Sequence, residues 1–390
     1  MIRDRRRPRP PVAAILALLS FLAPAGARAD DAALLAARVA DAQKLVAEVR
    51  GVGFRAPVAS ALLPEKDLEA VLARKLVEDL PVPFETYVAT LAALGLVEPD
   101  PDLLARLTRL YTRQVVGYYD PAEKRFYIVP ERAREAAGPA GDLMERILLA
   151  HELTHALQDQ RLGLDRRMKA LRESTDALLA LQAFLEGEAT LLMTDALLAG
   201  VPEEARQAFG DDPVDQILDG LAASSTVDGA EGVPEFFVKQ LVFPYAAGTA
   251  WVRQRKREGG WAALDAVYGS LPSTTREILR PGAAPERRKL LSSRQRPDSS
   301  RVPKGTVAAY SDTLGEWVLG VLLERAGAGE ASKDAAAAWQ DDRVVFFAPR
   351  GRPAGRGLGF LWRIRTTSPA GAGRIAALLA PLYAGRPAPA

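Results

Sequence analysis

The 390-residue chain contains no cysteine and only two histidines. Without cysteine the protein has no disulfide, no thiol nucleophile, no cysteine-bound iron–sulfur cluster and no zinc site built on thiolate. Hydrophobic residues make up 48% of the chain and charged residues 26%, which is the balance of an ordinary folded protein. The missing residue types therefore restrict the chemistry of the protein and leave its capacity to fold intact.

The first 29 residues have the layout of a secretory signal peptide. Five arginines lie between residues 3 and 9, an apolar stretch covers residues 12–23, and Ala27-Arg28-Ala29 ends the segment. An anchor helix would need about 20 apolar residues, and Pro24 and Gly26 interrupt the stretch too early. We expect cleavage after Ala29. Because no cysteine follows to carry a lipid, the mature protein is expected to be secreted or periplasmic.

The charge of the mature chain is close to zero. The full chain has a formal charge of +2, and removing residues 1–29 leaves 45 basic and 48 acidic residues, or about −3. A nearly neutral protein has little attraction for nucleic acid or anionic lipid. We therefore expect no nucleic-acid partner and no membrane span in the mature form. No feature of the sequence indicates an oligomeric state.

Hydrophobic periodicity predicts a mostly helical α+β protein in three regions. These are an N-terminal helical region (30–114), a region carrying the candidate chemistry (115–290) and a C-terminal α+β region (301–390). The second region opens with a hairpin over residues 115–129, where β-branched and aromatic residues flank Asp120-Pro121. The predicted helices up to residue 270 are 31–50, 65–80, 84–95, 101–113, 142–160, 174–198, 236–258 and 260–270.

The remaining segments are less regular. Residues 200–235 are interrupted by glycine, proline and aspartate, which is typical of loops around one short helix. Residues 281–303 are typical of a linker or a long surface loop. The C-terminal region is expected to contain two strands and three helices. In chain order they are helix 313–325, helix 331–339, strand 343–347, strand 357–365 and helix 369–382.

Both histidines of the chain lie in the segment His151-Glu152-Leu153-Thr154-His155. On a helix, residues four apart share a face, so the two imidazoles can hold one metal ion. Glu152 lies about 100° round the helix, where it can take a proton from a water that the metal activates. This combination arises by chance in about one random sequence in 3,000. The alternative is a pair of histidines on an ordinary helix without metal.

A hydrolytic zinc site needs a third protein ligand, and with no other histidine or cysteine this ligand has to be a carboxylate. Glu186 and Glu188, in the apolar helix predicted over 174–198, are the candidates, because a charged group in such a helix needs a partner. The two glutamates point about 200° apart, so only one can face the metal. Helix geometry alone leaves the choice open.

These motifs resemble those of gluzincin-type (HExxH...E) zinc metallopeptidases. The segment starting at His151 is similar to the active-site helix of the thermolysin-like members, and Glu186-Gly187-Glu188-Ala189 to the E-G-x-A ligand motif of the aminopeptidase branch. Together with the segments starting at Val116, Phe243 and Ser273, they resemble a family of secreted bacterial gluzincin-like proteins without assigned substrate. The resemblance covers roughly residues 110–345.

The resemblance implies a zincin-like catalytic domain, with His151, His155 and Glu186 as zinc ligands and Glu152 as general base. The chain departs from the related patterns at two positions. The thermolysin pattern has an aspartate where this chain has Thr190, and the family has a histidine where it has Arg280. The task of the family's histidine is therefore done differently here or not at all.

The function that follows is zinc-dependent hydrolysis of peptide or other amide bonds in a peptide or protein substrate. Such a reaction needs a donor for the developing oxyanion, and we expect Tyr245 in this role, with Arg280 as its competitor. The hairpin stands where the resembling enzymes place an edge strand that pairs with substrate. Two alternatives stay open: a catalytically silent zincin-fold accessory protein with a structural zinc, and an amidase or cell-wall hydrolase.

Overall fold

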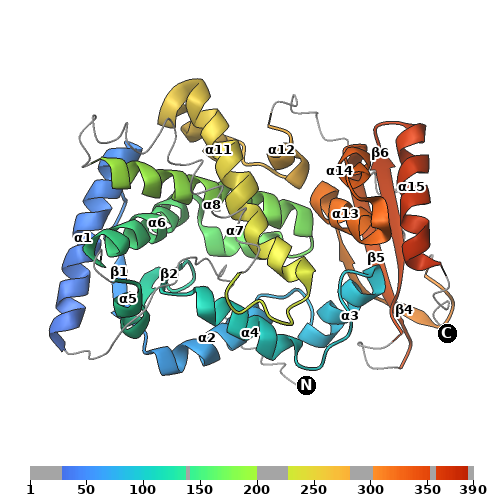
Figure 1. The fold of residues 1–390 in the computed structure, drawn as a ribbon, viewed down its shortest axis with the longest axis horizontal. Coiled ribbons are helices and arrows are strands. Elements are labelled where there is room, and N and C mark those ends of the chain that lie inside the picture. The colour runs from blue at the N-terminus through green and yellow to red at the C-terminus, as the bar shows by residue number, and fades with distance from the viewer. Residues whose placement is uncertain (1–28, 138–140, 200–226, 282–301, 352–356, 385–390) are drawn as a thin grey trace, which may run out of the picture. The chain divides into compact units, whose positions relative to one another are not determined.

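The computed structural model describes residues 29–137, 141–199, 227–281, 302–351 and 357–384 (Figure 1). It is a mostly helical α+β fold with two small sheets of three strands each. The predicted fold class is therefore confirmed. Residues 1–28 of the predicted signal peptide lie outside the described residues, as do most of the segments 200–235 and 281–303.

The chain divides into two compact units. The first unit falls within residues 1–79, 104–170 and 192–211, and the second within 80–103, 171–191 and 212–390. One helix, α8 (Thr175–Leu198), contributes to both units. The three regions expected from the sequence, 30–114, 115–290 and 301–390, stay a prediction.

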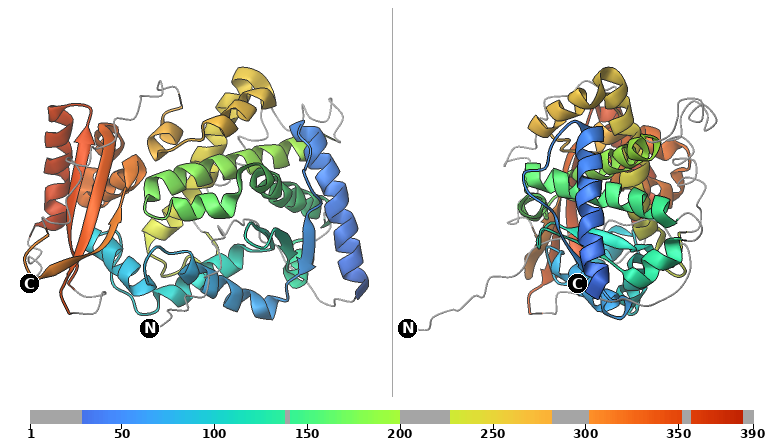
Figure 2. Two further views of the ribbon diagram at one scale, coloured as in Figure 1. Left: turned by 180° about the vertical axis from the view of Figure 1, so that it is seen from behind. Right: turned by 90° about the vertical axis from the view of Figure 1, so that its left-hand side faces the viewer.

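The first unit places a long helix pair beside a small sheet. Its elements are α1 (Ala29–Arg50), β1 (Ala59–Leu62), α2 (Glu65–Glu78), α4 (Leu103–Gln114), β2 (Gly117–Asp120), β3 (Arg125–Ile128), α5 (Pro130–Ala137), α6 (Gly141–Leu162) and α7 (Leu164–Ala170). Helix α1 packs along β1 and α6 (Figure 2). The predicted hairpin is present, because β2 and β3 pair antiparallel from Gly117↔Ile128 to Asp120↔Arg125.

The strand β1 corrects the expectation that residues 30–114 are all helical. It adds to the hairpin in the strand order β1-β3-β2 and pairs parallel with β3 from Ala59↔Arg125 onward. Its sequence, Ala-Ser-Ala-Leu, is too short and too weak in β-branched residues to stand out. The partner strand lies more than 60 residues further along the chain, so only the tertiary fold reveals the pairing.

The hairpin is fixed by apolar packing on one side and by a buried ion pair at its turn. Leu68 and Leu72 of α2 pack in one buried cluster with Val115, Tyr118 and Val129. Lys75 of α2 pairs with the fully buried Asp120, whose other oxygen accepts hydrogen bonds from the Ala122 and Glu123 amides. A buried carboxylate paired in this way stabilises one turn geometry over its competitors.

The second unit contains a long helical segment and a compact C-terminal α+β region. Its elements besides the first part of α8 are α3 (Phe84–Leu94), α11 (Glu235–Gly269), α12 (Thr275–Leu279), β4 (Thr306–Asp312), α13 (Gly315–Leu323), the π-helical turn η3 (Glu324–Ala328), α14 (Ala331–Ala336), β5 (Trp339–Pro349), β6 (Gly359–Thr366) and α15 (Pro369–Tyr383). The two helices predicted over 236–258 and 260–270 form one element broken at Gly259 and Gly260, whose backbone angles are not helical.

The C-terminal sheet has three strands, one more than the sequence predicts. Strands β4, β5 and β6 pair antiparallel in that order. Helix α15 packs against β6, where the rings of Phe360 and Tyr383 lie 5.5 Å apart. The core side chain Trp339, at the start of β5, is fully buried. The missed strand β4 begins three residues after the segment predicted as a linker, and its residues Val307 and Ala308 are exposed.

Among the described residues, α8 is the one helix that is long and apolar enough to cross a membrane. Of the 18-residue apolar stretch of this helix, 83% is buried inside the structure. This degree of burial is that of a core helix.

Candidate metal centre

The two histidines lie one turn apart on α6 and face the same space. Their Nε2 atoms are 3.2 Å apart, and their rings meet edge to face with centroids separated by 4.8 Å. Both residues are buried, His151 at 8% exposure and His155 at 2%. The i, i+4 spacing of the sequence therefore brings the two imidazoles together, as predicted.

The second nitrogen of His155 has a partner on the same helix. Its Nδ1 lies 2.9 Å from Oε1 of the fully buried Gln158. Since an amide oxygen only accepts, Nδ1 carries the proton and donates, which leaves the Nε2 lone pair for a metal. Sequence reasoning missed Gln158, although its position three residues after His155 puts it on the same helix face.

Glu186 of α8 completes the group. The ligand atoms offered by His151, His155 and Glu186 all lie within 4.8 Å of one another, so this group can bind a metal ion. Glu188 is engaged differently, since its Oε2 accepts a hydrogen bond of 2.6 Å from the hydroxyl of Tyr268 on α11. Of the two candidate glutamates, Glu186 is thus the one that stands with the histidines.

The donor set fits zinc. Two nitrogens and one carboxylate oxygen form the His-His-Glu set of catalytic zinc sites, which keep a fourth position open. The two Nε2 atoms, 3.2 Å apart, are close enough for both imidazoles to bind one metal ion. The full burial of the Glu186 carboxylate also suits a cation, because a buried charge needs a partner of opposite sign.

Glu152 is held by the sheet of the first unit. Its Oε2 accepts a hydrogen bond of 2.8 Å from the backbone N–H of Tyr119 on β2. The residue is 1% exposed, on the helix α6 that carries both histidines. A carboxylate fixed next to such a histidine pair can serve as a proton acceptor. The amide of Tyr119, on the outer edge of β2, is already used by this contact.

Two glycines allow α8 and α11 to cross in direct backbone contact. A Cβ atom on Gly187 would lie 2.3 Å from the backbone of Gly248, and one on Gly248 would lie 1.9 Å from the carbonyl oxygen of Ala183. No side chain fits at either position. Gly187, next to Glu186 in the Glu-Gly-Glu-Ala motif, is therefore required for the close packing of the two helices. This packing fixes the rotation of α8 against α11.

Tyr245 is buried on α11, three residues before the crossing at Gly248. Its role as oxyanion donor stays a prediction. Thr190, which replaces the aspartate of the thermolysin pattern, is buried on α8 one turn after Glu186.

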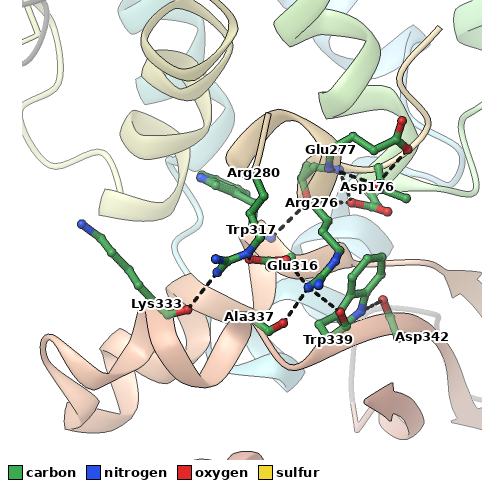
Figure 3. A network of polar contacts seen from close by, with 12 residues as sticks. Asp176, Arg276, Glu277, Arg280, Glu316, Trp317, Lys333, Ala337, Trp339 and Asp342 are labelled. Carbon is green, nitrogen blue, oxygen red and sulfur yellow. Dashed lines mark hydrogen bonds and ion pairs between the residues drawn. The ribbon is translucent and has the colours of Figure 1, made fainter. Parts of the chain in front are cut away.

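Arg280, the competitor of Tyr245, belongs to a network of ion pairs and hydrogen bonds (Figure 3). Its Nε donates to the nearly buried Glu316 at 2.8 Å, and its Nη2 donates to the Lys333 carbonyl at 3.4 Å. Arg276 pairs with the same carboxylate and also donates to the Ala337 and Trp339 carbonyls. Burial raises the pKa of Glu316, and the two arginines oppose that rise. The guanidinium of Arg280 thus connects the residue after α12 to α13 and α14.

Comparison with known proteins gives one structural neighbour. A crystal structure from Chloroflexus aurantiacus, of "a putative hydrolase with a novel fold", aligns with a TM-score of 0.42 and 22% sequence identity, over 67% of this chain and 90% of that chain. No protein-family model and no curated protein matches the sequence. At this TM-score the neighbour does not bear on the assignment of the site.

Proposed function

We propose that the protein is a secreted or periplasmic zinc-dependent hydrolase that cleaves peptide or related amide bonds. The observation that carries the proposal is the group formed by His151, His155 and Glu186, with Glu152 beside it on α6. A purely structural metal site has no use for a fixed carboxylate next to its ligands.

In this proposal His151, His155 and Glu186 hold the metal. When bound there, a zinc ion would supply a water of strongly lowered pKa and would polarise the carbonyl oxygen of the substrate. Glu152 accepts the proton of the attacking water on its carboxylate and later gives it to the leaving amine. The N–H of Tyr119 holds Oε2 of this carboxylate during both transfers.

The developing oxyanion needs a hydrogen-bond donor, and we assign this role to the hydroxyl of Tyr245. Arg280 is the weaker candidate, because its guanidinium is paired with Glu316 and Lys333 in a network around α13. If this guanidinium moved to bind an oxyanion, the carboxylate of Glu316, which is 2% exposed, would lose one of its two arginine partners.

Digestion of a peptide library by the purified, zinc-loaded protein and by its Glu152→Gln variant tests the function. We expect cleavage by the wild type and a rate lowered about 10²- to 10⁴-fold in the variant, the usual contribution of a general base. Zinc content should be equal in the two proteins. Equal cleavage by both would overturn the mechanism. A zinc protein without any cleavage would favour the accessory role.

A further inference from the structure

Tyr119 contacts helix α6 at two points. Its backbone N–H donates to Oε2 of Glu152 at 2.8 Å, and its hydroxyl donates to Oδ2 of Asp159 at 2.8 Å. Glu152 and Asp159 are seven residues apart, close to two helical turns, so they lie on one face of α6. All three residues are buried. A single residue of β2 therefore spans two turns of the helix that carries both histidines.

Asp159 is itself held from three directions. Lys124 Nζ lies 2.8 and 2.6 Å from its two carboxylate oxygens, and the amide of Leu164 donates to Oδ1 at 2.8 Å. Burial, followed by the nearby carboxylate of Asp159, raises the pKa of the Tyr119 phenol far above its usual value. The phenol keeps its proton at any working pH and acts as the donor in this contact.

The backbone at Lys124 supports the same arrangement. Lys124 has a φ of 55° and is, within the described ranges, the one residue other than glycine with a positive φ. This conformation is unfavourable for a side chain with a Cβ and persists where the surroundings fix it. Here it lies in the turn between β2 and β3, from which the lysine reaches Asp159 of α6.

A glutamate side chain has three rotatable bonds, whereas proton transfer requires the acceptor within about 0.5 Å of its working position. A misplacement of about 1 Å can cost about 100-fold in rate. The amide of Tyr119 limits the freedom of Glu152 only if β2 stays fixed against α6. The hydroxyl of the same residue makes the contact that fixes it.

We propose that Tyr119 is a positioning residue that braces β2 against α6 through Asp159 and thereby holds Glu152 in place for proton transfer. The inference rests on the proposed function and gives a role to a residue of the segment starting at Val116, for which the sequence predicts none. Tyr119 acts on the reaction through Glu152. Its side chain need not touch substrate.

The neighbouring Tyr118 supplies a matched control. Both tyrosines are 5% exposed, but successive strand residues point to opposite faces, and the ring of Tyr118 stacks on Tyr127 with centroids 5.4 Å apart. Tyr118→Phe and Tyr119→Phe therefore make the same chemical change at adjacent buried positions. Only the second removes the contact with Asp159.

The test compares steady-state kinetics of these variants and of Asp159→Asn, each zinc-loaded and of full length. We expect kcat to fall about tenfold or more in Tyr119→Phe and Asp159→Asn, with KM and zinc content unchanged, and to stay at the wild-type level in Tyr118→Phe. In a Glu152→Gln background, Tyr119→Phe should have no further effect on kcat, because the residue acts through Glu152. Wild-type kcat in Tyr119→Phe, or an equal loss in the Glu152→Gln background, would overturn the proposal.

Amide hydrogen exchange at residue 119 gives a readout that does not depend on activity. The Tyr119 amide should exchange slowly in the wild type and in Tyr118→Phe, and at least tenfold faster in Asp159→Asn. Unchanged exchange in Asp159→Asn would refute the proposal that the contact between Tyr119 and Asp159 fixes β2 against α6, even if the enzyme is active. If the wild type cleaves nothing, the proposed function fails, and the exchange rates still decide whether the brace exists.

Discussion

Two sets of buried carboxylates in the described part of the chain have different surroundings. Glu186 of α8 lies in a group with two histidines, and Glu152 lies on α6, the helix that carries those histidines. Around the start of α13, Asp342 is equally buried but accepts hydrogen bonds from four donors of that region: the Leu314 and Gly315 amides and the indoles of Trp339 and Trp362. Four donors satisfy the oxygens of a carboxylate.

Burial of an acidic group is thus insufficient to identify a reactive site. Asp176 resembles Asp342, because its Oδ1 accepts hydrogen bonds from the Thr275 amide and hydroxyl. Such carboxylates fix chain segments in place. Glu186, in contrast, stands within 4.8 Å of two imidazole nitrogens, which is the arrangement of metal ligands. Substitution of Glu152 or Glu186 should change turnover or metal content. Substitution of Asp342 or Asp176 should change the stability of the fold.

The largest effect is expected for the ligand carboxylate. Glu186→Gln should remove most of the metal from the dialysed protein, because a neutral amide is a poor ligand for zinc. Glu188→Gln is the matched control: its partner is Tyr268, and metal content should stay at the wild-type level. Metal analysis of both variants checks the assignment. Loss of metal in the Glu188 variant alone would mean that the other face of α8 binds the ion.

Removing the proposed oxyanion donor should have the next largest effect. Tyr245→Phe is expected to lower turnover about 10²- to 10³-fold and to leave metal content unchanged, because one donor to the transition state is lost while the ligands stay. Single-turnover kinetics on a cleaved peptide measure the effect. Full activity in this variant would exclude Tyr245 from the mechanism.

Asp312 in the second unit predicts a pH dependence of stability. Burial raises its pKa from 3.8 to about 6, an effect that the hydrogen bonds from Thr175 partly oppose. Between about pH 4 and pH 6 the folded state therefore binds this proton more tightly than the unfolded state does. The free energy of unfolding should decrease as the pH rises through this window.

Urea unfolding at several pH values measures this slope. Asp312→Asn should flatten it, whereas Asp334→Asn, at an exposed position of α14, should leave it unchanged. The same slope in the Asp312 variant would assign the dependence to another group. Metal content should be the same in the wild type and in Asp312→Asn at every pH in this window.

The smallest effect is expected at Arg280. Arg280→Gln should lower the free energy of unfolding by about 1 kcal/mol, since the guanidinium is partly exposed and Arg276 continues to pair with Glu316. Turnover should be unchanged. A large loss of turnover at normal stability would instead make Arg280 the oxyanion donor.

The sequence predicts the helices well where the signal is local, whether it is an amphipathic pattern or a long apolar run. Helix α3 runs from Phe84 to Leu94 against a predicted 84–95, and α8 from Thr175 to Leu198 against 174–198. The strands β1 and β4 were missed, because each depends on a partner strand far along the chain. Residues such as Ala59–Leu62 become a strand only when the tertiary fold supplies β3.

In the candidate site, too, local sequence predicts some features, and others depend on the tertiary fold. Spacing within one helix was sufficient to pair His151 with His155. It could not choose between Glu186 and Glu188, because that choice depends on how α8 packs against its neighbours and on the hydroxyl of Tyr268. The sequence does not reveal the role of Tyr119, since its contact with Glu152 runs through the backbone amide.

Metal stoichiometry of the wild type and of His155→Ala tests the central claim most directly. Three ligands from α6 and α8 should bind one zinc per chain, and removing one imidazole should empty the site and lower thermal stability. The account predicts one metal ion per wild-type chain and almost none in the variant. The same metal content in both proteins would contradict it.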